Sequence, residues 1–128
     1  MTAPALLGDG RALADILALA GPDMATRILA QMHADLTGVS ARLAPAISAD
    51  DHATPDWTEI RAQSHILIAL AGTIGAPRLH ALSVDLNGAA HAMDAPQLRA
   101  IAQPLQQDLA SLIALLAARL PAGNGGAA

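Results

Sequence analysis

Glycine and proline divide this sequence into segments whose apolar residues recur at helical spacing. Gly21 and Pro22 are adjacent, and Pro77 follows two positions after Gly75. Glycine is favoured just after a helix, and proline is favoured at the first position inside one. Both sites therefore predict that one helix ends and another begins almost at once. The helices on either side of Gly75 should consequently be antiparallel neighbours.

Each segment between these breaks has the apolar spacing of an amphipathic helix. A short helix should follow Asp9, a candidate N-cap, and should end at Gly21. A polar loop over residues 48–54 separates the second helix from the third, and Thr54 with Pro55 is the predicted cap of the third. The four long helices should cover residues 22–47, 55–74, 77–93 and 95–120.

The last helix has its own start signal and its own irregularity. Asp94 is the predicted N-cap, while Pro104 should kink this helix or split it into two. We predict an all-α domain over residues 1–120, an up-down antiparallel four-helix bundle with a short additional N-terminal helix, and a disordered tail over 121–128. The residues expected to face the core are Ile28, Met32, Leu36, Val39, Leu43 and Ile47 in the second helix, Trp57, Ile60, Ser64, Leu67, Ala71 and Ile74 in the third, Leu79, Leu82, Leu86, Ala89 and Met93 in the fourth, and Leu98, Ile101, Leu105, Leu109, Leu112 and Leu116 in the last.

Composition agrees with a helical fold and narrows the classes of function. Alanine occupies 32 of the 128 positions and Trp57 is the only aromatic residue, which suits closely packed helices. The 7 basic residues are arginines spread along the chain, so no basic stripe exists to bind nucleic acid. Cysteine is absent, which excludes disulfides and thiolate metal sites. No apolar run reaches membrane-spanning length, and we expect a cytoplasmic protein that binds neither nucleic acid nor membrane.

His65 interrupts an apolar run, SHILIALAGTIGA, within the third predicted helix. The core-facing stripe of that helix centres about 200 to 240° around the axis from His65, so the imidazole should face solvent. Arg61, Ile68, Ala69 and Gly72 should lie within about 60° of it. A solvated helix face normally carries Glu, Lys or Gln. An imidazole among small and apolar residues instead favours the docking of another protein.

Other chemistry has little support in the sequence. A single surface histidine is most often an ordinary solvated residue, and its position alone does not give His65 a reaction. His80 and His91 share one face of the fourth helix, but they are roughly 16 Å apart along its axis and too far apart for one metal site. No Ser/His/Asp spacing and no glycine-rich phosphate loop is present, so we do not expect an autonomous enzyme.

The segment over residues 56–94 resembles the signature of histidine phosphotransfer (HPt) domains, which carry phosphoryl groups in bacterial phosphorelays. In that family the acceptor histidine is followed by leucine, then by a Gly-Ala or similar pair, and then by a leucine-rich helix. The segment over residues 13–43 is similar to the first two helices of the family, with less specificity. The matching positions around the histidine are His65, Leu67, Gly75, Ala76, Leu79, Leu82 and Leu86.

The resemblance implies a function and assigns roles to particular residues. His65 would be the phosphoacceptor, which takes a phosphoryl group from a receiver-domain aspartate and passes it to a response regulator. Ile66, Ile68, Ala69 and Gly72 would form the docking surface for these partners. The partners would be a receiver domain and a hybrid sensor kinase. The receiver would supply Mg²⁺, and this chain would act as a monomer without a cofactor or metal of its own.

Two positions depart from the family pattern. HPt domains usually have a lysine and a glycine where this chain has Ile68 and Ala69. The family lysine is thought to hold the phosphoryl group, and Arg61, one turn before His65, is our candidate to supply positive charge instead.

Two further functions stay open, and the missing family lysine favours the first of them. The alternative to a phosphoryl carrier is a degenerate HPt-like adaptor, which binds a receiver domain or kinase without being phosphorylated. The third is a helical bundle that uses the His65 face for an unrelated contact or for dimerisation.

Overall fold

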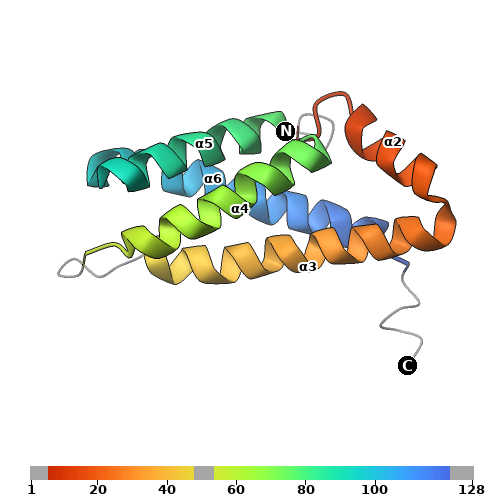
Figure 1. Cartoon of the computed structure of the whole chain (residues 1–128), viewed down its shortest axis with the longest axis horizontal. Coiled ribbons are helices and arrows are strands. Elements are labelled where there is room, and N and C mark those ends of the chain that lie inside the picture. Colours follow the sequence, from red (N-terminus) through yellow and green to blue (C-terminus); the bar gives the residue numbers. More distant parts are fainter. Residues whose placement is uncertain (1–5, 48–53, 122–128) are drawn as a thin grey trace.

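The computed structural model describes residues 6–47 and 54–121, and within these ranges the chain is all-α, as predicted (Figure 1). The predicted loop over 48–54 and the predicted tail over 121–128 lie outside the described residues, apart from Thr54 and Pro121. The helices are α2 over Arg11–Ala20, α3 over Pro22–Ile47, α4 over Trp57–Ile74, α5 over Pro77–Ala92 and α6 over Ala95–Arg119.

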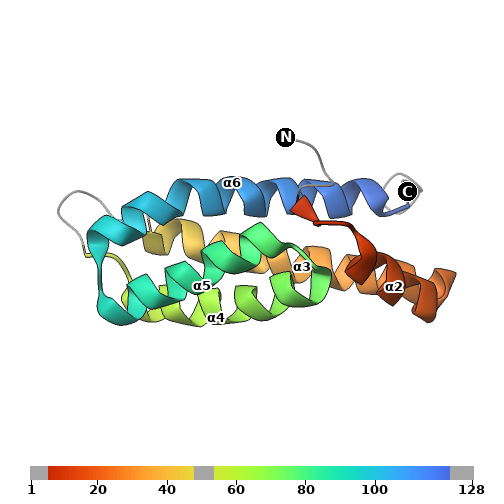
Figure 2. The same cartoon turned by 90° about the horizontal axis from the view of Figure 1, so that it is seen from above.

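The four long helices pack around one core, each antiparallel to the next along the chain (Figures 1 and 2). Around this core α3 contacts α4 and α6, and α5 contacts the same two helices. Helix α2 lies at one end of the bundle, against α3 and α4. This arrangement is the predicted up-down bundle with a short additional helix at its start. No helix in the described part of the chain combines the length and the apolar character that crossing a membrane requires.

The start of α2 lies one residue later than a cap at Asp9 would place it. Gly10 is the N-cap, with a left-handed backbone at φ 77°, which glycine adopts readily. The carboxylate of Asp9 nevertheless accepts a hydrogen bond from the amide of Arg11 at 3.0 Å. The prediction is correct for α6, where the carboxylate of Asp94 accepts from the amide of Gln97 at 3.1 Å.

The cap of α4 also differs from the prediction. Asp56 is the N-cap, because its carboxylate accepts a hydrogen bond from the amide of Glu59 at 3.1 Å. A capping side chain serves the second or third amide inside the helix. Thr54 and Pro55 precede that position, so the predicted cap was wrong and α4 begins at Trp57.

Met93 was predicted to be the last core residue of the fourth helix, and this prediction is wrong. Helix α5 ends at Ala92, and Met93 adopts a left-handed conformation at φ 51°. Its amide donates to the carbonyls of Ala89 and Ala90, which closes the end of the helix. The changed backbone direction removes the side chain from the apolar stripe and leaves it 64% exposed.

Pro104 does not split the last helix. Helix α6 continues through it from Ala95 to Arg119. Proline removes the amide that would bond to the carbonyl of Ala100, but both residues are exposed, so water can serve that carbonyl. Leu105 and Leu109, in the next two turns, are buried and hold the helix against the core.

The predicted core is largely confirmed. All six predicted core residues of α6 are buried, as are the predicted residues of α4 except Trp57, which is half-buried. Besides Met93, the exceptions elsewhere are Ile28, Ile47 and Leu82, which are only partly buried. In α3, Leu29 and Ala46 are buried although they were not in the predicted stripe.

Gly75 allows α2 to approach the turn between α4 and α5. Its backbone is left-handed at φ 87°, and a Cβ added there would lie 2.7 Å from the Cβ of Ala12. Real Cβ atoms do not approach each other this closely. Both the conformation and the space at this turn therefore require glycine.

An ion pair that the sequence analysis did not predict connects α5 to α6. Nε and Nη2 of Arg78 both donate to the carboxylate of Asp108. Asp108 is 4% exposed. The hydrogen bond and the charge of the carboxylate raise the pKa of the Arg78 guanidinium.

Candidate functional site

His65 lies on the outer surface of α4, and its side chain is exposed, as helical geometry predicts. Arg61, one turn earlier, is exposed, and so are Ala69 and Gly72 in the following two turns. Within the described residues the imidazole has no hydrogen-bonding or ionic partner. Its ring nitrogens are therefore open to an incoming molecule.

The two isoleucines near His65 lie on different flanks of α4. Ile66 is 44% exposed, and it lies about 100° around the helix from His65, on the side away from α5. Ile68 is half-buried, whereas we predicted it to be exposed. It lies four residues after Ser64 and four before Gly72, the two positions of α4 that approach α5. A partner centred on His65 would therefore meet only part of the Ile68 side chain.

A hydrogen bond and a close approach show how α5 lies against α4. The side-chain amide of Asn87 donates to Oγ of Ser64 at 3.0 Å. Further along, a Cβ added at Gly72 would lie 3.5 Å from Cδ2 of the His80 ring. These contacts are about two helical turns apart on each helix, so the two helices stay in register along the surface that carries His65.

Helix α5 contributes half of this exposed surface. Val84 lies one turn after His80, opposite Ile68, and is 46% exposed. His91 lies one turn after Asn87 and is also exposed. The sequence analysis placed His80 and His91 on one face of their helix but did not associate that face with His65. The spacing of His80, Val84, Asn87 and His91 was visible in the sequence, but the register between the helices was not.

We call this strip of exposed and half-buried residues on the two helices the α4–α5 face. Its residues include an arginine and three histidines but no carboxylate, in a chain whose net charge is −4. The chain has acidic groups elsewhere, so an anionic group meets less repulsion at this face than over the rest of the surface. The face consists of Arg61, His65, Ile68, Ala69 and Gly72 from α4, and His80, Val84, Asn87 and His91 from α5.

No group of three or more metal-ligating side chains in residues 6–47 and 54–121 is arranged to hold a metal ion. The histidines of the face are spread along the helices and do not converge. Arg78 is also unavailable to an anion at the face, because Asp108 already occupies its guanidinium. Arg61 is therefore the cation best placed to act beside His65.

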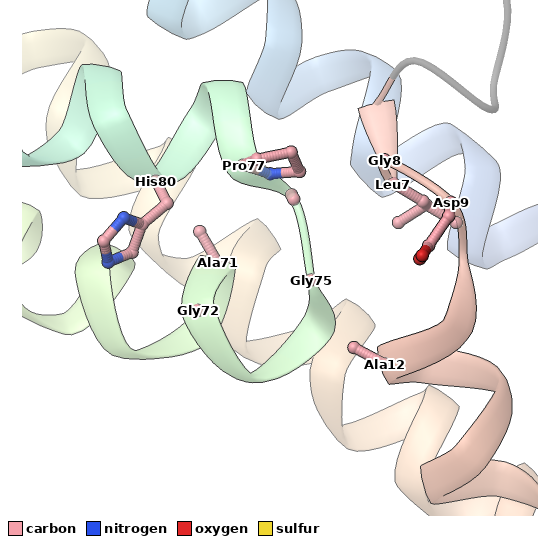
Figure 3. Close-up of a pocket in the computed structure, with 10 residues that line it drawn as sticks. Leu7, Gly8, Asp9, Ala12, Ala71, Gly72, Gly75, Pro77 and His80 are labelled. Atoms are coloured by element: carbon pink, nitrogen blue, oxygen red, sulfur yellow. The ribbon is translucent and has the colours of Figure 1, made fainter.

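A pocket of about 470 Å³ begins where the α4–α5 face ends (Figure 3). Gly72 and His80 belong to both the face and the pocket. The turn between α4 and α5 forms one wall, and the start of the described chain forms the other. The side chains of His80 and Asp9 lie on opposite sides of the opening (Figure 3). The lining residues are Leu7, Gly8, Asp9, Ala12, Ala71, Gly72, Gly75, Ala76, Pro77 and His80.

Comparisons of the chain with family models, with curated proteins and with solved structures found no match. The HPt resemblance around His65 therefore stays a prediction. The structure adds to it the exposure of the imidazole, the composition of the face and the register of the two helices that form it.

Proposed function

We propose that this protein is a phosphoryl carrier of a phosphorelay, in which His65 accepts a phosphoryl group from a receiver-domain aspartate and passes it to a second receiver. The observation that carries the proposal is an exposed imidazole, without a partner among the described residues, on a face that contains Arg61 and no carboxylate. Its partners would be a hybrid sensor kinase and a response regulator, which implies a cytoplasmic location.

The chemistry suits an exposed histidine. In its neutral form, imidazole has a ring nitrogen whose lone pair can act as a nucleophile. A ring nitrogen attacks the phosphorus of the acyl phosphate, the N–P bond forms, and the P–O bond to the aspartate breaks. The aspartate leaves as a carboxylate, and the imidazole loses the proton of its other nitrogen to water. The reverse sequence transfers the group to the second receiver.

The surroundings of His65 support such a transfer. Ala69 and Gly72 project little beyond the helix, so the rim of a partner's active site can approach the imidazole closely. Arg61 lies one turn before His65 and can stabilise the charge on the phosphoryl oxygens. Transfer of this kind depends mainly on positioning and charge, and the receiver would bring Mg²⁺ and its own charged groups.

A specific observation favours an adaptor as the second candidate. Ile68 is a half-buried apolar residue at the position where the resemblance leads us to expect a lysine, and the chain contains no lysine at all. An adaptor would use the same face to bind a receiver but would not form phosphohistidine. Binding and labelling therefore have to be measured separately.

The test uses receiver domains phosphorylated with ³²P in the presence of Mg²⁺. We expect an acid-labile, alkali-stable label on the wild type and on the control His33→Gln in α3, and no label on His65→Gln. Receiver binding without any label would replace the carrier with the adaptor. Label that persists on His65→Gln would overturn the assignment of the phosphoacceptor.

A further inference from the structure

Asn87 makes the side-chain hydrogen bonds that join α5 to α4 in the described part of the chain. Its amide nitrogen donates to Oγ of Ser64 at 3.0 Å and to the carbonyl of Arg61 at 3.3 Å. The hydroxyl of Ser64, which is fully buried, donates to the same carbonyl at 3.1 Å. Three residues thus form one network at the junction of the two helices.

The network lies in the helical turn that ends at His65. In an α-helix the carbonyl of residue 61 is the acceptor for the amide of residue 65, because each amide bonds four residues back. The carbonyl of Arg61 therefore accepts hydrogen bonds from the side chains of Asn87 and Ser64. It is also the helical acceptor for the amide of His65. A displacement of Asn87 would act directly on the turn that carries the imidazole.

We infer that Asn87 is a positioning residue for His65, which holds the imidazole in a fixed place relative to the part of the α4–α5 face that α5 contributes. This inference rests on the proposed function. Val84 and His80 would contact a partner from α5 while His65 receives the phosphoryl group on α4. A partner that contacts both helices can dock in only one way if the helices keep a fixed register. A displacement of the reacting atoms by about 1 Å is enough to slow a group transfer.

Stability of the bundle does not by itself explain asparagine at this position. Leu67 and Ala71 of α4 and Leu86 of α5 are fully buried members of the apolar core, whereas Asn87 is half-buried. Asparagine is also a weaker helix former than alanine. The amide is valuable here because it can donate to two acceptors on the neighbouring helix at once.

The experiment compares a large and a small phosphoryl donor on Asn87→Ala. The large donor is a phosphorylated receiver domain with Mg²⁺, which must dock on both helices. The small donor is phosphoramidate, which needs only the imidazole: its P–N bond breaks, ammonia leaves, and the N–P bond to His65 forms. We expect labelling by the receiver to slow about tenfold or more, and labelling by phosphoramidate to stay within about twofold.

Three variants serve as comparisons. Gln103→Ala removes an exposed side-chain amide from α6 and should leave both rates unchanged. Ser64→Ala should slow the receiver reaction in the same way, and the double variant with Asn87→Ala should be less than additive, because both changes break one network. Equal slowing of both donors by Asn87→Ala, or no slowing of either, would overturn the inference.

A second measurement does not depend on any partner. Hydrogen exchange at the amide of His65 should become about tenfold faster in Asn87→Ala than in Gln103→Ala, because the local turn opens more easily. If the receiver fails to label the wild type, the proposed carrier function fails, and this exchange rate alone decides whether Asn87 holds the turn. Unchanged exchange at His65 would show that it does not.

Discussion

Arg78, in the first turn of α5, donates two hydrogen bonds to the carboxylate of Asp108, which lies in the middle of α6 and is 4% exposed. A buried carboxylate costs free energy unless it is paired and hydrogen-bonded. The guanidinium satisfies both requirements and fixes the start of α5 against α6. It thereby helps to orient the helix that provides half of the α4–α5 face.

Replacing Asp108 with asparagine should destabilise the bundle. The substitution keeps the shape of the side chain but removes the charge that pairs with Arg78, and the free energy of unfolding should fall by about 1–3 kcal/mol. Urea denaturation followed by circular dichroism measures this change. Asp85→Asn, on the exposed side of α5, is the control and should change stability by less than about 0.5 kcal/mol. Equal stability of the two variants would contradict a structural role for the pair.

The pH dependence of this pair follows from the pKa of Arg78. Asp108 raises that pKa above its ordinary value, so folding favours the charged guanidinium. The stabilisation is fully present below the pKa of arginine in the unfolded chain and is lost only as pH rises through the folded value. The stability difference between wild type and Arg78→Gln should therefore be the same at pH 7 and pH 9. A difference that disappears over this interval would contradict the assignment.

Gly75→Ala should destabilise the protein by about 2 kcal/mol, because the left-handed backbone disfavours a side chain and the new methyl group would clash with Ala12. Gly38→Ala in α3 is a control with the opposite expected sign. Apart from its chain neighbours and the nearby backbone of α3, no atom of the described residues lies within 4 Å of its added Cβ, and alanine is the better helix former. Thermal unfolding of the two variants should therefore shift in opposite directions. A neutral Gly75→Ala would show that α2 can move away from the turn.

The sequence was sufficient to predict features that depend on neighbours along the chain. Gly21 with Pro22, and Gly75 with Pro77, predicted where helices end and begin. The spacing of apolar residues predicted that His65 faces solvent. The caps were less certain, because Asp9, Asp56 and Thr54 all have side chains that can accept an amide proton. Only the path of the backbone decides which of them reaches the helix.

Features that depend on register between helices could not be predicted in the same way. Arg78 and Asp108 are 30 residues apart in sequence, and Asn87 and Ser64 are 23 apart. Nothing in the local pattern of either residue identifies its partner, since a rotation or shift of one helix would pair different side chains. For the same reason the sequence did not predict that His80 and Val84 of α5 belong to the same face as His65 of α4. That relation depends on how the two helices pack.

Gly72→Leu should impair partner binding while leaving the fold intact. A Cβ at this position would be in ordinary contact with the His80 ring, and the rest of the leucine would project from the α4–α5 face. A phosphorylated receiver should label this variant about tenfold more slowly or worse, because the added bulk opposes docking. Phosphoramidate labelling should be unaffected. A normal receiver rate in Gly72→Leu would place the docking surface away from this end of the face.

Arg61→Glu tests the charge beside His65, the proposed phosphoacceptor. The substitution changes only the side chain, so the hydrogen bonds that the Arg61 carbonyl accepts from Ser64 and Asn87 can persist. A carboxylate one turn before His65 should repel the phosphoryl group and slow labelling by a receiver about tenfold at low ionic strength. The difference from wild type should shrink as salt is added. Arg99→Glu, on α6, should leave the rate unchanged, and an equal rate for both variants would remove Arg61 from the site.

Ile68→Lys separates the two roles that a residue at this position can have. Ile68 is half-buried, and a lysine there could pack its methylene groups in the same place while its ammonium reaches solvent. If the wild type is a phosphoryl carrier, the variant should be labelled by a phosphorylated receiver at least as fast as wild type, because the added charge offsets any lost apolar contact. Ile68→Met, which keeps the apolar stem without the charge, is the matched control. Loss of receiver binding in Ile68→Lys but not in Ile68→Met would show instead that Ile68 acts through apolar docking, as the adaptor requires.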